Sequence, residues 1–340
     1  MTTQRVYVIH ENPEWFPPFA AAFEAEGVPV EELLLTDGGA LGSIDLTAEP
    51  APGVYWSRMS ASSHTRGNEH SKEYARALLG WLERAGRTVV NGSHVLELEV
   101  SKVAQHGLLR DAGFDVPRTT AVFGSASLKA AARTFTDGQD VPFITKHNQG
   151  GKGLGVRRFD TLAEFDAYVD GPEFEAPVDG ITLLQELLTA REPFITRAEF
   201  VGGEFVYAVR VDTSAGSFEL CPADACEVPQ VIAGAVCDVP GTETPGAPAA
   251  FSIRDEVTAE HPLVQQLRTF LADQRIQVAG VEFMETTDGR TVVYDVNTNT
   301  NYNPAVEAVA PVSGPRAIAR FTGALLEREY AASAAAATTA

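Results

Sequence analysis

Apolar positions in the first hundred residues alternate between strand spacing and helical spacing. An apolar run at Val6–Ile9 predicts a strand, and aromatic residues then recur at helical spacing from Pro13 to Gly27. A second strand is expected over 28–35, a helix over 71–86 and a third strand over 88–90. Alternation of this kind predicts an open α/β sheet. No G-x-G-x-x-G follows the first strand, so the pattern does not support a dinucleotide-binding fold.

The pattern changes toward strands after residue 117. Ser101 caps a helix expected over 102–112, and Thr161 with Glu164 forms the capping box of a later helix. Gly202-Gly203 separates two apolar runs and predicts a hairpin. The remaining expected elements are strands over 141–146, 156–159 and 181–184, a helix over 262–274 and a hairpin around Asp288-Gly289. Residues 212–255 are rich in Pro, Gly, Ala and Cys, and they support no assignment.

A glycine-rich stretch lies between two of these strands. It contains Gly150, Gly151, Gly153 and Gly155, together with Lys146 at the end of the incoming strand and Lys152 in the middle. It is not a Walker P-loop, because neither a Ser or Thr nor a helix follows the Gly-Lys pair. Glycines let backbone N–H groups approach anionic oxygens closely. A flexible hairpin tip is the alternative, but lysines among the glycines of so acidic a chain favour phosphate binding.

Two carboxylates are expected to face each other on the last hairpin. If Asp288-Gly289 is a two-residue turn, Glu282 lies opposite Asp295, with Cβ atoms roughly 5 Å apart. Asn297 points to the same face two residues later. Like charges in this arrangement destabilise a hairpin unless a cation neutralises them, and oxygen ligands suit Mg²⁺. The alternative is an acidic face exposed to solvent.

Several polar residues are candidates for binding substrate. Asn299 and Asn301 belong to an Asn-rich run that follows the hairpin and either orients a substrate or forms a self-satisfied turn. The candidate carboxylate clamps are Arg58, Arg66 and Arg197, since a guanidinium matches a carboxylate, although a surface ion pair is the commoner role of each arginine taken alone. His10 follows the first strand, where open α/β sheets bind ligands, or is a neutral loop histidine.

Composition narrows the class of protein. The 340 residues are 44% hydrophobic, which is enough for two or three domains. Twenty-six basic against 46 acidic residues give a net charge of −20, which disfavours nucleic acid and anionic membranes as partners. Three cysteines without a C-x-x-C pair, and an N-terminus without a signal-peptide pattern, suit a reducing cytoplasm.

Taken in order, these motifs resemble the ATP-grasp superfamily, and most closely its glutathione synthetase and ribosomal-protein glutamate ligase branch. The resemblance covers roughly residues 55–309 and includes SKVAQHGLLRDAGFDVPRT, GGKGLGV and LLQELL. It implies an N-terminal open α/β domain (1–98), a first ATP-binding lobe (99–185) and a second lobe with the Mg²⁺ site (186–330). Overall this is an α/β fold, α+β within the two lobes. The last residues, 331–340, have no large apolar side chain to bury and are expected to be disordered.

The resemblance also implies roles for individual residues. Lys102 and Lys146 match the two nucleotide lysines, and Arg210 matches an arginine that contacts the γ-phosphate. Glu186 with Leu187 or Leu188 matches the hinge that holds adenine. The Mg²⁺ ligands, with Mn²⁺ as an alternative ion, match Glu282, Asp295 and Asn297, although the family usually has Asp and then Glu-x-Asn.

Two further departures concern substrate binding. An acidic residue often stands two positions before Arg197, but Ile195 is found there, and Glu192 is the substitute candidate for binding ribose. Residues 213–253 do not match the expected glycine-rich substrate loop, so the resemblance does not identify the acceptor.

The implied activity is a carboxylate–amine ligase that uses ATP, forms an acyl phosphate and joins small-molecule acid and amine substrates. Arg210, Lys146 and Lys152 are then the candidate catalytic residues. A phosphotransferase without ligation would carry the same nucleotide motifs, and a non-catalytic nucleotide sensor is a third possibility that predicts loss of lysines or metal ligands. Whether copies of the chain form a homo-oligomer is left open.

Overall fold

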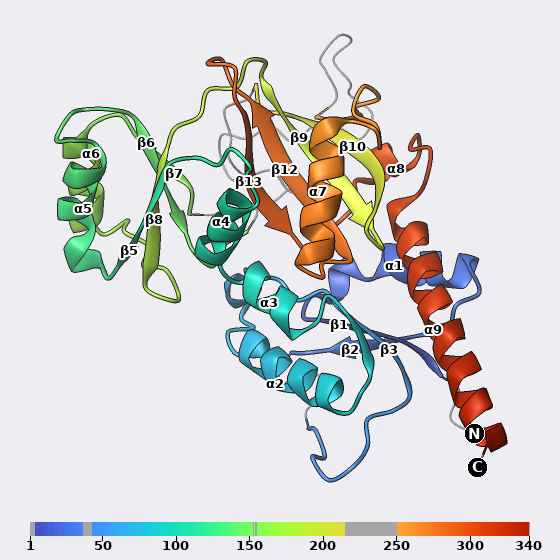
Figure 1. Cartoon of the computed structure of the whole chain (residues 1–340). Helices are drawn as coiled ribbons and strands as arrows, with labels where there is room; N and C mark the ends of the chain where they lie inside the picture. Colours follow the sequence, from blue (N-terminus) through green and yellow to red (C-terminus); the bar gives the residue numbers. More distant parts are fainter. Residues whose placement is uncertain (1–3, 37–42, 152, 154, 215–249, 340) are drawn as a thin grey trace.

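The computed structural model describes residues 4–36, 43–151, 153, 155–214 and 250–339, and these residues form three sheets (Figure 1). The first is parallel, with strand order β2-β1-β3-β4. It comprises β1 (Arg5–His10), β2 (Val30–Leu34), β3 (Gly53–Ser57) and β4 (Thr88–Val90). Helices α2 (Ser71–Arg84) and α3 (Ser93–Glu99) contribute to the core on one side, and α1 (Pro17–Ala25) contributes to the core on the other. The predicted open α/β sheet is confirmed.

The helix expected from Pro13 is interrupted. A short 3-10 turn, η1 (Pro13–Trp15), comes first, and α1 begins only at Pro17. The side chain of Asn12 caps the turn by accepting a hydrogen bond from the Glu14 N–H at 3.1 Å. Pro17 and Pro18 have no N–H to donate, so the turn cannot continue into a helix through them, whereas both suit the first positions of a new helix.

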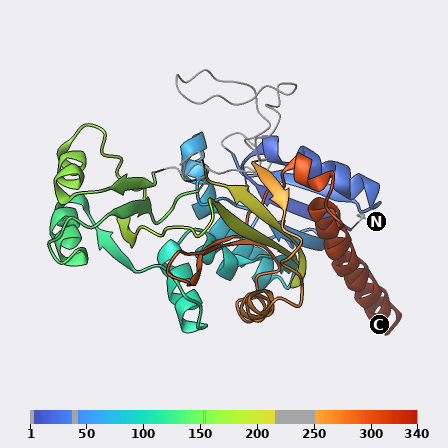
Figure 2. The same cartoon turned by 90° about the horizontal axis from the view of Figure 1, so that it is seen from above.

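The second sheet is antiparallel, with order β5-β8-β6-β7, and two helices share a hydrophobic core with one of its faces. Its elements are β5 (Thr119–Phe123), β6 (Phe143–His147), β7 (Arg157–Phe159), β8 (Ile181–Glu186), α5 (Leu128–Phe135) and α6 (Leu162–Asp170). We call this unit the first lobe, and Figures 1 and 2 show it projecting from one end of the molecule. The capping box of Thr161 and Glu164 is present at the start of α6.

The third sheet lies at the centre, with order β11-β10-β9-β12-β13 (Figure 1). Its strands are β9 (Phe194–Val201), β10 (Glu204–Asp212), β11 (Phe251–Ile253), β12 (Val278–Glu285) and β13 (Thr291–Asn297). Helices α4 (Lys102–Asp111) and α7 (Pro262–Asp273) join the hydrophobic core on one face. The other face shares a core with the N-terminal sheet and with α8 (Pro304–Glu307) and α9 (Gly314–Thr339).

The last hairpin contains two irregularities that the sequence did not predict. Thr286 pairs with Arg290 through a backbone hydrogen bond of 2.9 Å, so the turn holds three residues instead of two. A bulge at Tyr294 then shifts the register by one residue, which restores the pairing of Glu282 with Asp295. The expected opposition of the two carboxylates is therefore present, although the expected turn was wrong.

Helix α9 returns the chain to the N-terminal sheet and contacts α1, β1 and β3. It runs to Thr339, so the segment expected to be disordered from residue 331 is helical up to that point. Alanine has the highest helix propensity of all residues, which accounts for helix in this alanine-rich run. None of the described helices is long and apolar enough to cross a bilayer.

Asn91 joins the N-terminal sheet to the central sheet at the end of β4. Its Nδ2 donates to the carbonyl oxygens of Val278 (2.8 Å) and Thr298 (3.2 Å), and its Oδ1 accepts from the N–H groups of Gln277 and Val278. The residue is buried and has a φ of 52°, a conformation that asparagine tolerates better than most residues. A single side chain thus fixes β12 and the loop after β13 relative to the N-terminal sheet.

We expect Asn91→Ala to lower the free energy of unfolding by about 3 kcal/mol, because it leaves buried backbone groups without partners. Urea unfolding of the full chain measures this change. Asn68→Ala is the matched control, since among the described residues the Asn68 side chain makes one hydrogen bond, to the Glu11 carbonyl oxygen at 3.1 Å. Equal losses for the two variants would contradict the linking role of Asn91.

Candidate active site

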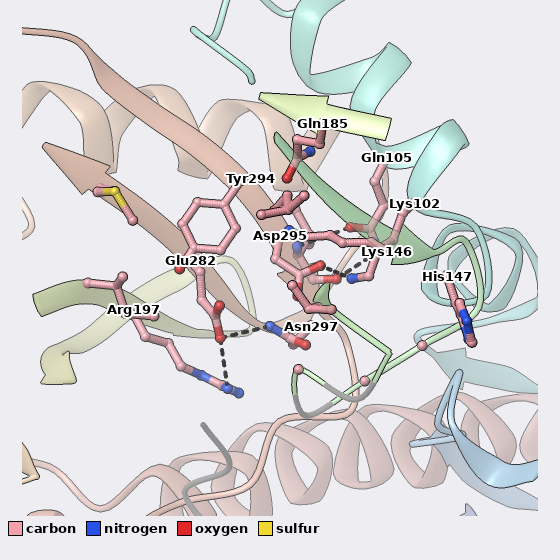
Figure 3. A pocket seen from close by; sticks show the side chains of 18 of the residues that line it. Lys102, Gln105, Lys146, His147, Gln185, Arg197, Glu282, Tyr294, Asp295 and Asn297 are labelled. Atoms are coloured by element: carbon pink, nitrogen blue, oxygen red, sulfur yellow. Dashed lines mark hydrogen bonds and ion pairs between the residues drawn. The ribbon is translucent and has the colours of Figure 1, made fainter. Parts of the chain in front are cut away.

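A cavity of about 500 Å³ separates the first lobe from the central sheet (Figure 3). It collects most of the residues that the sequence singled out from motifs far apart in the chain. Those that line it are Lys102, Lys146, Gly150, Gly151, Gly153, Glu186, Leu187, Leu188, Arg197, Glu282, Asp295, Asn297, Asn299 and Asn301. Lys152 lies outside the described residues.

Lys102 begins α4 and reaches across the cavity to β13. Its Nζ lies 2.5 Å from Asp295 Oδ1. One turn later, the side chain of Gln105 donates to the Val296 carbonyl oxygen (2.9 Å) and accepts from the Val296 N–H (3.1 Å). Burial disfavours the charge of Lys102, but Asp295, with smaller effects of Glu99 and Glu282, raises the pKa of Lys102 above its usual value. The side chain of Lys102 is therefore protonated, and its ion pair with Asp295 holds it in place.

Lys146 on β6 points into the same cavity, because it shares a strand face with Ile144. Its Nζ lies 5.2 Å from the centre of the Tyr294 ring. Burial lowers the pKa of Lys146 to about 8, and the positive charge of Lys102 acts in the same direction. This cation is energetically costly as it stands, so an anion in the cavity would stabilise it.

Glu282 and Asp295 lie opposite each other on β12 and β13. Burial and the charge of Asp295 raise the pKa of Glu282, while burial of Asp295 is outweighed by Lys102 and Lys146, so that its pKa is lowered. Asn297 Nδ2 lies 3.3 Å from Glu282 Oε1. Among the described residues no group of three His, Cys, Asp or Glu side chains gathers to hold a metal ion. Two carboxylates and an amide oxygen fit a Mg²⁺ ion that completes its coordination with water and phosphate oxygens.

The first residue of the Gly-rich loop (residues 148–156) forms hydrogen bonds with the N-terminus of α4. Asn148 Oδ1 accepts a hydrogen bond from the Val103 N–H at 2.9 Å, and the Asn148 carbonyl oxygen accepts from the Lys102 N–H at 3.3 Å. Gly155 has a φ of 75° and lies against the His147 ring, where a Cβ would be about 3.1 Å from the ring. Asn148 therefore links the start of the loop to the helix end that carries Lys102.

The opposite end of the cavity is apolar where the chain crosses from the first lobe to the central sheet. Leu187 and Leu188 line it with Ile144, Val156 and Met284. Glu186 also lines it, but its carboxylate accepts hydrogen bonds from the Arg118 N–H (2.9 Å) and from Arg290 Nη1 (3.0 Å). This end can hold a flat apolar group beside backbone polar atoms.

Arg210 and Glu192 do not line the cavity. Arg210 pairs with Thr196, one residue from Arg197, so strand alternation directs it to the face opposite Glu282. Its guanidinium carbon lies 4.2 Å from the centre of the Phe194 ring. Glu192 is exposed in the crossing segment. The geometry supports neither the expected γ-phosphate contact nor the expected ribose contact.

Three other substrate candidates are engaged within the protein. His10 is buried, with Nδ1 3.0 Å from the Asn12 carbonyl oxygen, and burial lowers its pKa to about 3. Arg58 is 1% exposed and donates to the Thr300 carbonyl oxygen (3.2 Å) and to Asn301 Oδ1 (2.8 Å).

Arg66 pairs with the buried carboxylate of Glu11 and lies over the Trp15 ring. None of His10, Arg58 and Arg66 lines the cavity, so their positions do not support the expected clamps.

Arg197 does reach the cavity, over Gly280. A Cβ on Gly280 would be 2.5 Å from Arg197 Nε, so only glycine admits the guanidinium there. Arg197 donates to Glu199 (2.7 Å), to Thr300 Oγ1 (2.6 Å) and, at 3.4 Å, to Glu282. The guanidinium thus couples Glu282 to the Asn-rich loop (residues 297–303).

Sequence reasoning missed Glu99, Gln105 and Asn148. Glu99 is half-buried in the cavity wall, where Oε2 accepts hydrogen bonds from the N–H and Oγ1 of Thr298, both at 2.8 Å. All three side chains form hydrogen bonds with backbone groups that are distant in sequence, and no local sequence motif predicts such a contact. The only available signal was their proximity to Lys102 and to the Gly-rich stretch.

NMR of protein labelled at lysine tests the environment of Lys146. The chain has five lysines, and we expect the Lys146 signal to titrate near pH 8. Lys146→Arg should remove that signal, whereas titration of all five lysines above about pH 10 would contradict the burial of a cation.

The lowered pKa of Lys146 also predicts how its contribution to stability changes with pH. Since the folded pKa of about 8 is below the reference value of 10.5, the unfolded state binds more protons than the folded state between these two pH values. The contribution of Lys146 to stability therefore increases as the pH rises through this range.

Comparisons with known proteins identify the fold. No family model matches the chain, and no curated protein matches it. Among solved structures, the D-cycloserine synthetase DcsG superposes with a TM-score of 0.63 at 15% identity, over 94% of this chain and 99% of that chain. D-alanyl-alanine synthetase A from Vibrio cholerae gives 0.63 at 13% identity, over 96% and 99%.

The ATP-grasp ligase PsnB, in complex with a phosphomimetic precursor variant, Mg and ADP, gives a TM-score of 0.59 at 16% identity, over 95% of this chain and 99% of that chain. At these identities the likeness concerns the fold, and it extends over nearly the whole of each chain. The chain therefore has the ATP-grasp fold.

Proposed function

We propose that this protein is an ATP-dependent carboxylate–amine ligase. The observation that carries the proposal is the composition of one cavity. Two half-buried lysines and two facing carboxylates lie at its centre, an apolar end lies on one side, and the Asn-rich loop lies on the other. The apolar end would hold the base of a nucleotide, the lysines and carboxylates would hold its phosphates with a metal ion, and the Asn-rich loop would hold an acceptor beyond the phosphates.

The nucleotide would lie with adenine between Leu187, Leu188 and Met284, and with its phosphates at Lys102, Lys146 and the Gly-rich loop. Backbone N–H groups and fixed cations stabilise transferring phosphate in this way without reorganisation. Glu282, Asp295 and Asn297 would hold Mg²⁺, or Mn²⁺, which neutralises phosphate charge when bound. A cytoplasmic location, where ATP is available, suits this chemistry.

The proposed reaction has two steps. A carboxylate oxygen of the acid substrate attacks the γ-phosphorus, the bond from that phosphorus to the β–γ bridging oxygen breaks, and ADP leaves. An amine then attacks the acyl carbon, phosphate leaves with the electron pair of the C–O bond, and the nitrogen loses a proton. Lys102 and Lys146 contribute to the first step by holding the phosphates and offsetting their charge.

The likeness to synthetases and ligases of amino acids and peptides supports ligation over simple phosphotransfer. Phosphotransfer to a small carboxylate is the second candidate, since it needs the same nucleotide residues. A non-catalytic sensor is disfavoured because both lysines and both carboxylates are in place.

The Asn-rich loop is the proposed side for the amine. Thr298 is held by Glu99, Thr300 by Arg197 and Glu199, and Asn301 by Arg58. The Asn299 Oδ1 atom is buried and has no hydrogen-bond partner among the described residues. A buried carbonyl oxygen without a donor costs about 1–3 kcal/mol, which an N–H of a bound amine would relieve.

ADP release with Mg²⁺, ATP and a panel of amino-acid pairs tests the proposal. We expect release to require both an acid and an amine, and Asp295→Asn to lower it at least about 100-fold, because that variant loses the ion pair with Lys102 and a metal ligand. ADP release that needs one acceptor would favour phosphotransfer. A wild-type protein that fails to bind ATP would overturn the nucleotide site.

Asn299→Leu, which has a similar shape but no acceptor, should raise KM for the amine about tenfold and leave KM for ATP unchanged. Asn299→Asp, which keeps the acceptor oxygen, should stay close to wild type. Steady-state kinetics with each substrate varied in turn measures the difference. An equal rise in all KM values would indicate a disturbed loop and not a lost amine contact.

A further inference from the structure

Lys72 is a buried cation that neither the proposed reaction nor the predicted motifs use. It lies at the start of α2 and is 2% exposed. Its ammonium has three polar neighbours: the Ala61 carbonyl oxygen at 3.3 Å, His64 Nδ1 at 3.3 Å and Gln149 Oε1 at 2.6 Å. An ammonium has three protons to donate, and these three acceptors can take all of them.

The shortest of these contacts crosses between two parts of the fold. Ala61 and His64 follow β3 in the N-terminal sheet, whereas Gln149 is the second residue of the Gly-rich loop. Gln149 directly follows Asn148, which is already fixed on the N-terminus of α4. Two residues beyond it, Gly151 lies so near Ser62 that a Cβ would be 3.2 Å from Ser62 Oγ. The start of the loop thus lies against the start of α2 and the segment that joins β3 to α2.

The cost of burying Lys72 argues that this contact has a role. Burial lowers the pKa of Lys72, and its three hydrogen-bond neighbours are uncharged when His64 accepts through Nδ1. Burial and the charge of Lys72 also lower the pKa of His64, which favours that neutral form. A buried lysine held by neutral acceptors contributes little to stability compared with an apolar side chain of the same size. What it does supply is a directed hydrogen bond to the loop.

We propose that Lys72 is a positioning residue for the nucleotide site. It fixes Gln149 against the start of α2 and thereby holds the backbone N–H groups of Gly150 and Gly151 in the cavity before the phosphates arrive. This inference rests on the proposed function, because it requires that the Gly-rich loop contacts nucleotide. The loop that provides Ala61 and His64 also places Ser60 and Ser62 in the cavity wall. Nucleotide affinity therefore depends on a part of the protein outside both ATP-binding sheets.

Calorimetric titration of the full chain with Mg²⁺ and a non-hydrolysable ATP analogue tests the role of Lys72. Lys72→Met keeps the length of the side chain and removes the ammonium, and Gln149→Met removes the acceptor. We expect each variant to weaken binding about tenfold, comparable with the loss of a hydrogen bond to a charged group. The double variant should weaken binding no more than the stronger single variant, because both remove one interaction.

Lys129→Met is the matched control, since Lys129 pairs with Asp170 on the helices of the first lobe and does not line the cavity. Its affinity should equal that of wild type. Unchanged affinity in both Lys72→Met and Gln149→Met would overturn the inference while leaving the proposed function intact. Additive losses in the double variant would also overturn it, since the residues would then act separately.

If Lys72→Met does not fold, Gln149→Met alone decides the question, because the exchange lies in a loop and leaves Lys72 in place. Retention of wild-type affinity by Gln149→Met then overturns the inference. Absence of binding by the wild-type protein would overturn the proposed function and the inference with it.

Discussion

The ion pair between Lys102 and Asp295 is the contact on which the candidate site depends. It joins α4 to β13 at the point where the first lobe, the central sheet and the Asn-rich loop meet. Asn148 ties the Gly-rich loop to the same helix end, and Gln105 holds the helix against Val296. Because Asp295 is neutralised by Lys102, it remains ionised despite burial, while the neighbouring Glu282 has a raised pKa. Phosphates and a divalent cation would enter a site whose charges are already nearly balanced.

The distribution of lysine strengthens this interpretation. The chain has five lysines against 46 acidic residues, so lysine is not used as a general surface cation. Lys102 and Lys146 line the cavity, Lys72 contacts the Gly-rich loop, and Lys152 belongs to that loop by sequence. A net charge of −20 repels polyphosphate over most of the surface. In the proposed function, local cations in a low-dielectric cavity would therefore attract the nucleotide to one place.

Patterns set by local periodicity were predictable, and contacts set by burial were not. Strand alternation placed Asp295 opposite Glu282, and this survived because an extra turn residue and a bulge at Tyr294 compensate each other. The same alternation directs Arg210 away from the cavity, but its pairing with Thr196 could be read only from the folded sheet. Arg58 carried the right chemistry for a clamp, yet it is enclosed by aromatic rings and by the Asn-rich loop. No sequence pattern predicted the role of Lys72, because its hydrogen-bond partner Gln149 is 77 residues away in the chain.

The hydrophobic clusters divide the described part of the fold into separate units. The N-terminal sheet, one face of the central sheet and α9 share a single hydrophobic cluster, which makes them one unit. The first lobe has its own aromatic core around Phe143 and Phe165, with no residue in common with the others. Polar contacts hold it across the cavity, chiefly those of Asn148 and Gln149 and the pair of Glu186 with Arg290. Hydrogen bonds and an ion pair therefore connect the first lobe to the rest of the fold, in place of a shared hydrophobic cluster. Lys72 adds one of these hydrogen bonds from the N-terminal domain, so in the proposed function it would affect nucleotide binding without touching the nucleotide.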